Sequence, residues 1–285
     1  MKRIGFVCAI LLAAISSTKA EVEFAYEAGA EIVSAYLWRG QYNGGLSFQP
    51  DVEVGYDGEH TSLRFGAWGS VGASDWAFYK NLPMYPDGSN PNTYFVPELD
   101  LMLNFQVAGV ILGATHYYYF GGSPFFNWGK FDPINGSAGT SQTEVTVGYD
   151  FRDKCEVPLT FTWNTMVAGN DLNEEDDGTY KRAFSSYMEI KYDQPLPFEM
   201  TLSLALGMSP WRSDNVYGNE KFAVTNISAR LEKSWEFDAC ELILFGQGML
   251  NTNDINKSNV FVWAAGDDKV CVQRLNGTIG LGVWF

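Results

Sequence analysis

Two histidines, His60 and His116, limit the acid–base chemistry that this chain can perform. A serine-type hydrolase needs an imidazole beside a hydroxyl, because the imidazole must accept the hydroxyl proton. His116 is followed by three tyrosines, and the next serine is Ser123, beyond a Gly-Gly pair. His60 stands beside Thr61 and Ser62 in a segment typical of a short turn. Neither histidine fits a hydrolase site, so we expect no catalytic residues.

A metal site is the second kind of chemistry to consider. The acidic run 170–178 would need a glycine at its sixth position to form an EF-hand loop, but counting from Asp171 that position is Asp176. We interpret the run as a solvated acidic loop. Three cysteines follow the first twenty residues; their odd number means that they cannot all pair within one chain, and their spacing suits no metal site. They are Cys155, Cys240 and Cys271. We therefore expect neither a metal nor a cofactor.

The secondary-structure elements of this chain can be recognised by apolar residues at every second position. From Phe198 to Met208 every second residue is apolar, and the positions between them are polar or small. A helix cannot separate two such sets, whereas a strand does so by its geometry. The segments 99–105 and 145–151 repeat the pattern. These segments are therefore predicted to be strands with one apolar face.

Twelve such segments cover the chain, and the spacers between them alternate in length. The segments start near Phe24, Leu46, Ser62, Phe95, Gly109, Ser141, Pro158, Ala183, Phe198, Ala223, Ala239 and Val272. Short spacers lie at 57–59, 107–109, 152–157, 193–196 and 232–237. Long ones lie at 72–93, 121–140, 169–182, 210–222 and 251–270, with a shorter one at 40–45. Tight turns at one end and long loops at the other are typical of transmembrane barrels, whereas a soluble sandwich has no reason to sort its loops.

We therefore predict one all-β domain over residues 21–285, an antiparallel transmembrane β-barrel of about 12 strands. Its short turns would face the periplasm and its long loops the outside. Residues 1–20 resemble a signal peptide, with basic Lys2 and Arg3, an apolar run from Ile4 to Ile15, and small residues before Glu21.

The final segment alternates up to the last residue, Phe285. A terminal aromatic residue in phase with an apolar face is typical of the closing strand that outer-membrane assembly machinery recognises. We expect the protein to lie in the outer membrane, with lipid, lipopolysaccharide and that machinery as partners.

Charge excludes other classes of protein. Without residues 1–20 the chain keeps 16 of 19 basic residues and all 34 acidic ones, a formal charge of 16 − 34 = −18. A field of this sign repels nucleic acid. No uninterrupted apolar run of about 20 residues remains after residue 20, which excludes a helical membrane protein.

Charged residues on the strands are expected to face the lumen, because a charge facing lipid at mid-bilayer costs about 2–4 kcal/mol. The candidate pore-lining residues are Arg39, Arg64, Arg230, Arg274, Glu31, Glu53, Glu98, Asp100, Glu144 and Glu189. Glu27, Asp51, Asp150, Glu199, Glu241 and Lys191 are assigned to the same face. The acidic excess favours cations over anions. A narrow lumen filled by interlocked arginine–carboxylate pairs is the open alternative.

Three short motifs carry a resemblance to a family. Tyr36-Leu37-Trp38-Arg39-Gly40 is expected to end the first strand, with Tyr36 and Trp38 at the lipid interface and Arg39 pointing inward. Together with the segments 66–70 (GAWGS) and 117–119 (YYY), this motif resembles the TorF-type porins, a family of uncharacterised exported proteins. The likeness covers mainly residues 28–120. It implies an outer-membrane barrel with a pore, and it supplies no catalytic residues.

Three functions follow, in order of preference. The first is a channel for small cationic or neutral solutes. The second is a non-conducting surface barrel that binds a partner or glycan through aromatic residues in two long loops. The third is a lipid-modifying enzyme. The loop aromatics are Trp76, Tyr79, Tyr85, Tyr94, Phe125, Phe126, Trp128 and Phe131.

Overall fold

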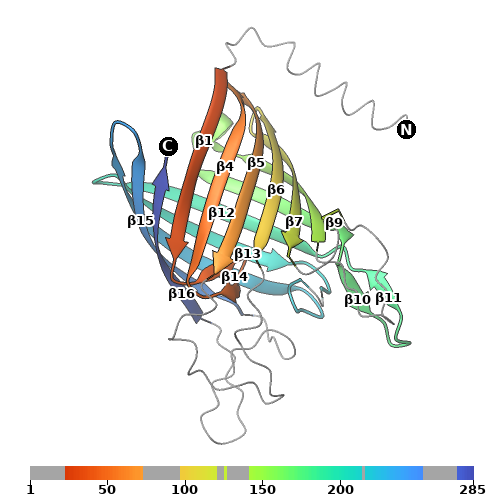
Figure 1. Cartoon of the computed structure of the whole chain (residues 1–285). Coiled ribbons are helices and arrows are strands. Elements are labelled where there is room, and N and C mark those ends of the chain that lie inside the picture. Colours follow the sequence, from red (N-terminus) through yellow and green to blue (C-terminus); the bar gives the residue numbers. More distant parts are fainter. Residues whose placement is uncertain (1–22, 73–96, 121–124, 127–140, 214–215, 253–274) are drawn as a thin grey trace, which may run out of the picture.

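A computed structural model describes residues 23–72, 97–120, 125–126, 141–213, 216–252 and 275–285 of the chain. Twelve of its strands form one closed antiparallel barrel (Figure 1). They are β1 (Glu23–Val33), β4 (Ser47–Gly58), β5 (Thr61–Gly72), β6 (Glu98–Val107), β7 (Val110–Tyr119), β8 (Ser141–Asp150), β9 (Leu159–Gly169), β12 (Ser186–Leu196), β13 (Met200–Ser209), β14 (Ala223–Glu236), β15 (Glu241–Leu250) and β16 (Leu275–Trp284). Each begins within three residues of its expected start.

The barrel closes where the first and last strands meet. β1 pairs with β4 on one side and with β16 on the other, with Gly29 opposite Trp284. The backbone N–H of Phe285 donates to the carbonyl of Ala28 at 2.8 Å, which extends the seam to the last residue. Closure gives every strand two neighbours, the condition that hydrocarbon imposes on a spanning sheet.

Apolar side chains cover the outside of this barrel. On β4, Val52, Val54 and Tyr56 face outward and are 41–52% exposed, while the alternate residues Asp51 and Glu53 face the lumen. The same exposure of large apolar residues recurs on strands around the barrel, for example at Leu204 and Leu206 on β13 and at Ile279 and Leu281 on β16. In a soluble protein the apolar side chains lie inside and the polar ones outside, and here the arrangement is reversed. This confirms the predicted transmembrane β-barrel.

Short turns join the strands at one end, which we call the short-turn end, and longer segments join them at the long-loop end. The β8–β9 turn contains a helical turn, α2 (Arg152–Cys155). The expected turns at 193–196 and 232–237 are wrong, since β12 continues to Leu196 and β14 to Glu236. The polar residues there belong to the ends of these two strands rather than to turns.

The true turn after β12 contains residues expected in a strand. Phe198 and Glu199 have positive φ values of 66° and 54°, and Phe198 is 83% exposed. Glu199 therefore does not face the lumen. It pairs at 2.6 Å with Lys233, which lies opposite outward-facing Met200.

Two small hairpins occupy the long-loop end. β10 (Leu172–Glu174) pairs with β11 (Tyr180–Arg182), and Figure 1 shows this hairpin projecting beyond the barrel. β2 (Tyr36–Trp38) pairs with β3 (Gln41–Gly44). No helix in the described part of the chain is long and apolar enough to cross a membrane.

Candidate functional site: a hairpin across the lumen

The segment 34–46, which we call the lumen hairpin, turns into the barrel instead of continuing β1. β1 ends at Val33, and the next residues are held by Thr278 of β16, whose Oγ1 lies 3.2 Å from Ser34 Oγ and accepts from the Ala35 N–H at 3.0 Å. The turn of this hairpin is Arg39-Gly40, with φ values of 47° and 88°. Positive φ at both positions is typical of a type I′ hairpin turn.

The aromatic residues of the lumen hairpin therefore lie inside the barrel. Tyr36 packs on Trp68 of β5, with ring centroids 5.4 Å apart. Trp38 stacks on Tyr217 at 5.9 Å and meets Tyr117 of β7 edge-on at 5.9 Å. The expectation that Tyr36 and Trp38 face lipid is wrong, because the bend after Val33 breaks the strand alternation on which it rested.

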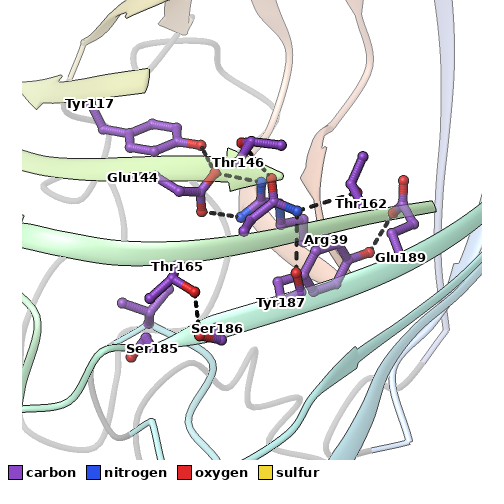
Figure 2. A network of polar contacts seen from close by, with 12 residues as sticks. Arg39, Tyr117, Glu144, Thr146, Thr162, Thr165, Ser185, Ser186, Tyr187 and Glu189 are labelled. Carbon is purple, nitrogen blue, oxygen red and sulfur yellow. Dashed lines mark hydrogen bonds and ion pairs between the residues drawn. The ribbon is translucent and has the colours of Figure 1, made fainter. Parts of the chain in front are cut away.

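Arg39 ties the hairpin to the opposite wall (Figure 2). Its guanidinium donates two hydrogen bonds to the carboxylate of Glu144 on β8, at 2.6 and 2.8 Å. It donates a third to the hydroxyl of Tyr217 at 2.8 Å. The same group lies over the rings of Trp38 and Tyr187, 4.8 and 4.7 Å from their centroids. Bidentate pairing of this kind fixes orientation as well as distance.

Electrostatics keep this arginine charged despite its burial. Burial alone would lower the pKa of Arg39, but the carboxylate of Glu144 and the nearby tyrosines outweigh it and raise the pKa above its ordinary value. Glu144 is itself 1% exposed and also accepts from the hydroxyl of Tyr117 at 3.1 Å. The pair is thus a largely buried ion pair, with Arg39 15% and Glu144 1% exposed, held by several hydrogen bonds.

Gly40 lets the hairpin approach the wall closely. A Cβ at this position would lie 1.6 Å from the carbonyl oxygen of Thr225, and the φ of 88° already disfavours other residues. Its N–H donates to the sulfur of Met249 at 3.1 Å, and its carbonyl accepts from Asn251 at 3.0 Å. Only glycine fits here without displacing the hairpin.

A small core packs against the lumen hairpin at the long-loop end. It consists of Tyr117, Met166, Tyr187, Val216 and Tyr217, all buried, with Trp38 and Tyr119 packed against it. In a transmembrane barrel such a core lies in the lumen, because the outer face meets lipid. The lumen is therefore packed on this side at the level of Arg39.

Below this packing, towards the short-turn end, the lumen holds a cavity of about 570 Å³. Arg39 forms part of its lining, and most of the rest comes from inward residues of four adjacent strands. They are Glu189, Lys191 and Asp193 of β12, Thr201, Ser203 and Ala205 of β13, Asn226, Ser228, Arg230 and Glu232 of β14, and Gln247 of β15, together with Arg152.

The opposite wall of the lumen is acidic. β1, β4, β5 and β6 are described in full, and Arg64 is the only basic residue in them. Glu27 and Glu53 stand directly opposite each other in the β1–β4 pair. The inward carboxylates of this wall include Glu27, Glu31, Asp51, Glu53, Asp57, Glu98 and Asp100.

The predicted lumen residues fall into pairs and single groups. Arg39 pairs with Glu144, and Arg230 pairs at 3.1 Å with Glu31 although two strands separate β14 from β1. Both arginines therefore join distant parts of the wall. Arg64 forms an ion pair with Asp57 on the neighbouring strand and bridges nothing.

The other predicted residues make local contacts. Glu189 accepts from the hydroxyl of Tyr187 at 2.5 Å. Glu98 and Asp100 are buried beside each other, and Glu53 is half-buried near Arg64. Arg274 lies outside the described residues, as do Cys271 and most of the two aromatic loops.

The surroundings of His116, and those of Asp171 described below, could not be predicted from the sequence, because folding joins residues that are distant along the chain. His116 faces outward at the long-loop end, where its Nδ1 lies 2.9 Å from the hydroxyl of Thr143 and its Nε2 lies 2.9 Å from the carbonyl of Phe125. The rings of Phe125 and Phe126 pack on it, and it is 6% exposed. Thr143 is 27 residues from His116 along the chain, so the sequence does not reveal that its hydroxyl lies beside the imidazole. That the protein has no catalytic residues stays a prediction.

The acidic run is not uniformly solvated, which corrects the expectation for 170–178. Asp171 is fully buried and accepts from the Ser185 N–H at 3.0 Å, and burial raises its pKa. Asp177 is bound instead by Thr179 within an exposed turn. Among the described residues no group of three or more His, Cys, Asp or Glu side chains could hold a metal ion.

Comparisons with known proteins add little. No family of sequences matches the chain, and no curated protein matches it either. Similar solved structures include the COG4313 outer membrane channel from Pseudomonas putida F1 (12% identity, TM-score 0.40, 93% of this chain and 94% of that one). Others are Salmonella typhi OmpF in complex with daunomycin (9%, 0.38, 93% and 98%) and an anion-selective porin from Comamonas acidovorans (8%, 0.33, 93% and 99%).

These TM-scores are too low to support an argument, so the assignment rests on strand pairing and on the distribution of side chains. On that evidence the chain is a closed transmembrane β-barrel of twelve strands, crossed at the long-loop end by a hairpin that Arg39 fixes to Glu144.

Proposed function

We propose that this protein is an outer-membrane channel for small solutes, with a preference for cations, and that the lumen hairpin forms its constriction. The observation that carries the proposal is the acidic wall formed by β1, β4, β5 and β6 inside a closed, lipid-facing barrel. Fixed carboxylates along a lumen raise the local concentration of cations and oppose anions. The short-turn end would face the periplasm and the long-loop end the outside.

Several finer assignments belong to the same proposal. Residues 1–20 would be removed on export, and the closing strand ending in Phe285 would be the segment that barrel-assembly machinery binds. Lipopolysaccharide would contact the outer rim. The resemblance of residues 28–120 to the TorF-type porins supports a pore, although two of its motif aromatics, Tyr36 and Trp38, lie inside the lumen.

Ion selectivity tests the channel directly. In planar bilayers with a KCl gradient, we expect small unitary currents and a reversal potential of the sign given by K⁺ permeation. Asp51→Asn together with Glu53→Gln removes two carboxylates of the acidic wall, so the reversal potential should move towards zero. Glu59→Gln, in the exposed β4–β5 turn, is the matched control and should change nothing. Absence of current, or a preference for Cl⁻ in the wild type, would reject the proposal.

One observation favours a second function. The packing of Trp38, Arg39 and the buried tyrosines fills part of the lumen, as in a barrel that presents loops and conducts nothing. In that case the wild type would carry no current, and a variant lacking residues 121–140 would lose binding of a surface partner or glycan while the barrel stayed heat-modifiable on a gel.

A further inference from the structure

The 570 Å³ cavity below Arg39 has the size of a small-molecule site, since such pockets span about 300–1,000 Å³. It lies on the side of the lumen opposite the acidic wall. Its chemistry differs from that wall, because basic and acidic residues alternate along β12 and β14.

Every charged residue that lines the cavity already has a partner. Lys191 and Asp193 pair at 3.1 Å, and Arg230 holds both Glu31 and Glu232 at 3.1 Å. The remaining pairs are Arg39 with Glu144, Arg152 with Asp150, and Glu189 with the hydroxyl of Tyr187. A charged solute would have to displace one member of a pair and leave the other without its counter-charge, which is costly in a partly buried site.

Neutral polar groups of the same lining are unoccupied. Thr201 of β13, Ser228 of β14 and Gln247 of β15 face the cavity, and in the part of the chain that the structure describes their side chains have no hydrogen-bond partner. Two hydroxyls and an amide supply both donors and acceptors. The lining groups without any partner in the described part of the chain are therefore uncharged.

We propose that this cavity binds a neutral polyhydroxylated solute, such as a sugar, through Thr201, Ser228 and Gln247. The inference rests on the proposed function, which it deepens by naming the class of solute. Sugar hydroxyls both donate and accept, so they match the free groups without disturbing the ion pairs around them. The acidic wall sets the preference among ions, while this cavity selects a neutral solute.

Equilibrium binding tests the inference without requiring the pore to conduct. The mature chain, folded in a detergent without a sugar headgroup, is titrated calorimetrically with glucose, gluconate and glucosamine, three probes of similar size and different charge. We expect saturable binding of glucose that persists in about 1 M NaCl, where the Debye length is about 3 Å. Thr201→Val and Ser228→Ala should each weaken binding about 5-fold, the effect of one lost hydrogen bond. Thr115→Val, an inward threonine of β7 outside the cavity, should not.

The outcomes separate the two proposals. Ion currents without glucose binding would overturn this inference and leave the channel intact. Glucose binding without currents would support the site and reject the channel. Tighter binding of gluconate or glucosamine, lost in high salt, would overturn the inference, because the site would then recognise charge. Equal affinity of all variants would overturn it too, since it would place the sugar elsewhere.

Discussion

At the scale of single residues, the position of the lumen hairpin depends on the contact between Arg39 and Glu144. Removing one partner of a buried ion pair leaves an uncompensated charge and costs about 3–5 kcal/mol, whereas the intact pair contributes much less than this. The ion pair is therefore best understood as a device that fixes one position of the hairpin. Its bidentate geometry and the two aromatic rings beneath the guanidinium make that position specific.

Gly40 offers a sharp test of the hairpin's position. Gly40→Ala places a methyl group against the Thr225 carbonyl and should expel the turn from the lumen. Arg39, now exposed, should become a trypsin site in proteoliposomes, and mass spectrometry of the fragments would show cleavage after it. Gly178→Ala is the control, because Gly178 also has a positive φ but nothing lies within 4 Å of its added Cβ. If trypsin does not cleave after Arg39 in the Gly40→Ala variant, the close approach of Gly40 to the Thr225 carbonyl would be contradicted.

At the scale of elements, the alternation of apolar and polar residues predicted the barrel strands. It did not predict the lumen hairpin, where tertiary contacts decide the course of the backbone. The twelve strands were found because lipid imposes one apolar face on each of them. The lumen hairpin was missed because it obeys no such constraint and is held by residues far along the chain, including Glu144, Tyr217 and Thr278. One local signal was present. In both Arg39-Gly40 and Ala108-Gly109 a glycine is the second residue of a tight turn, and both residues of each turn have positive φ.

Strand β13 allows the inside-out arrangement to be tested with neighbouring residues. Leu204 faces lipid and Ala205 faces the cavity. Leu204→Lys should lower the free energy of unfolding in vesicles by about 2–4 kcal/mol, the cost of a charge facing lipid near mid-bilayer. Ala205→Lys introduces the same charge into the lumen and should cost much less. Denaturant titration monitored by gel mobility gives both values, and the reverse order would contradict the assignment of the faces.

At the scale of the whole molecule, the protein separates two kinds of wall within one barrel. Carboxylates with few basic partners line β1, β4, β5 and β6, while paired charges and free hydroxyls line β12 to β15. Sequence reasoning found the acidic excess but could not divide it between walls, because the division depends on which strands face each other across the lumen. It also left open whether arginines join distant parts of the wall, and Arg39 and Arg230 do.

The most direct measurement of this account is the single-channel conductance of the wild type against a chain in which residues 35–45 are replaced by a short Gly-Ser linker. If the lumen hairpin forms the constriction, the shortened chain should fold to a heat-modifiable barrel and show a much larger unitary conductance than the wild type. A folded, shortened barrel with wild-type conductance would contradict the account.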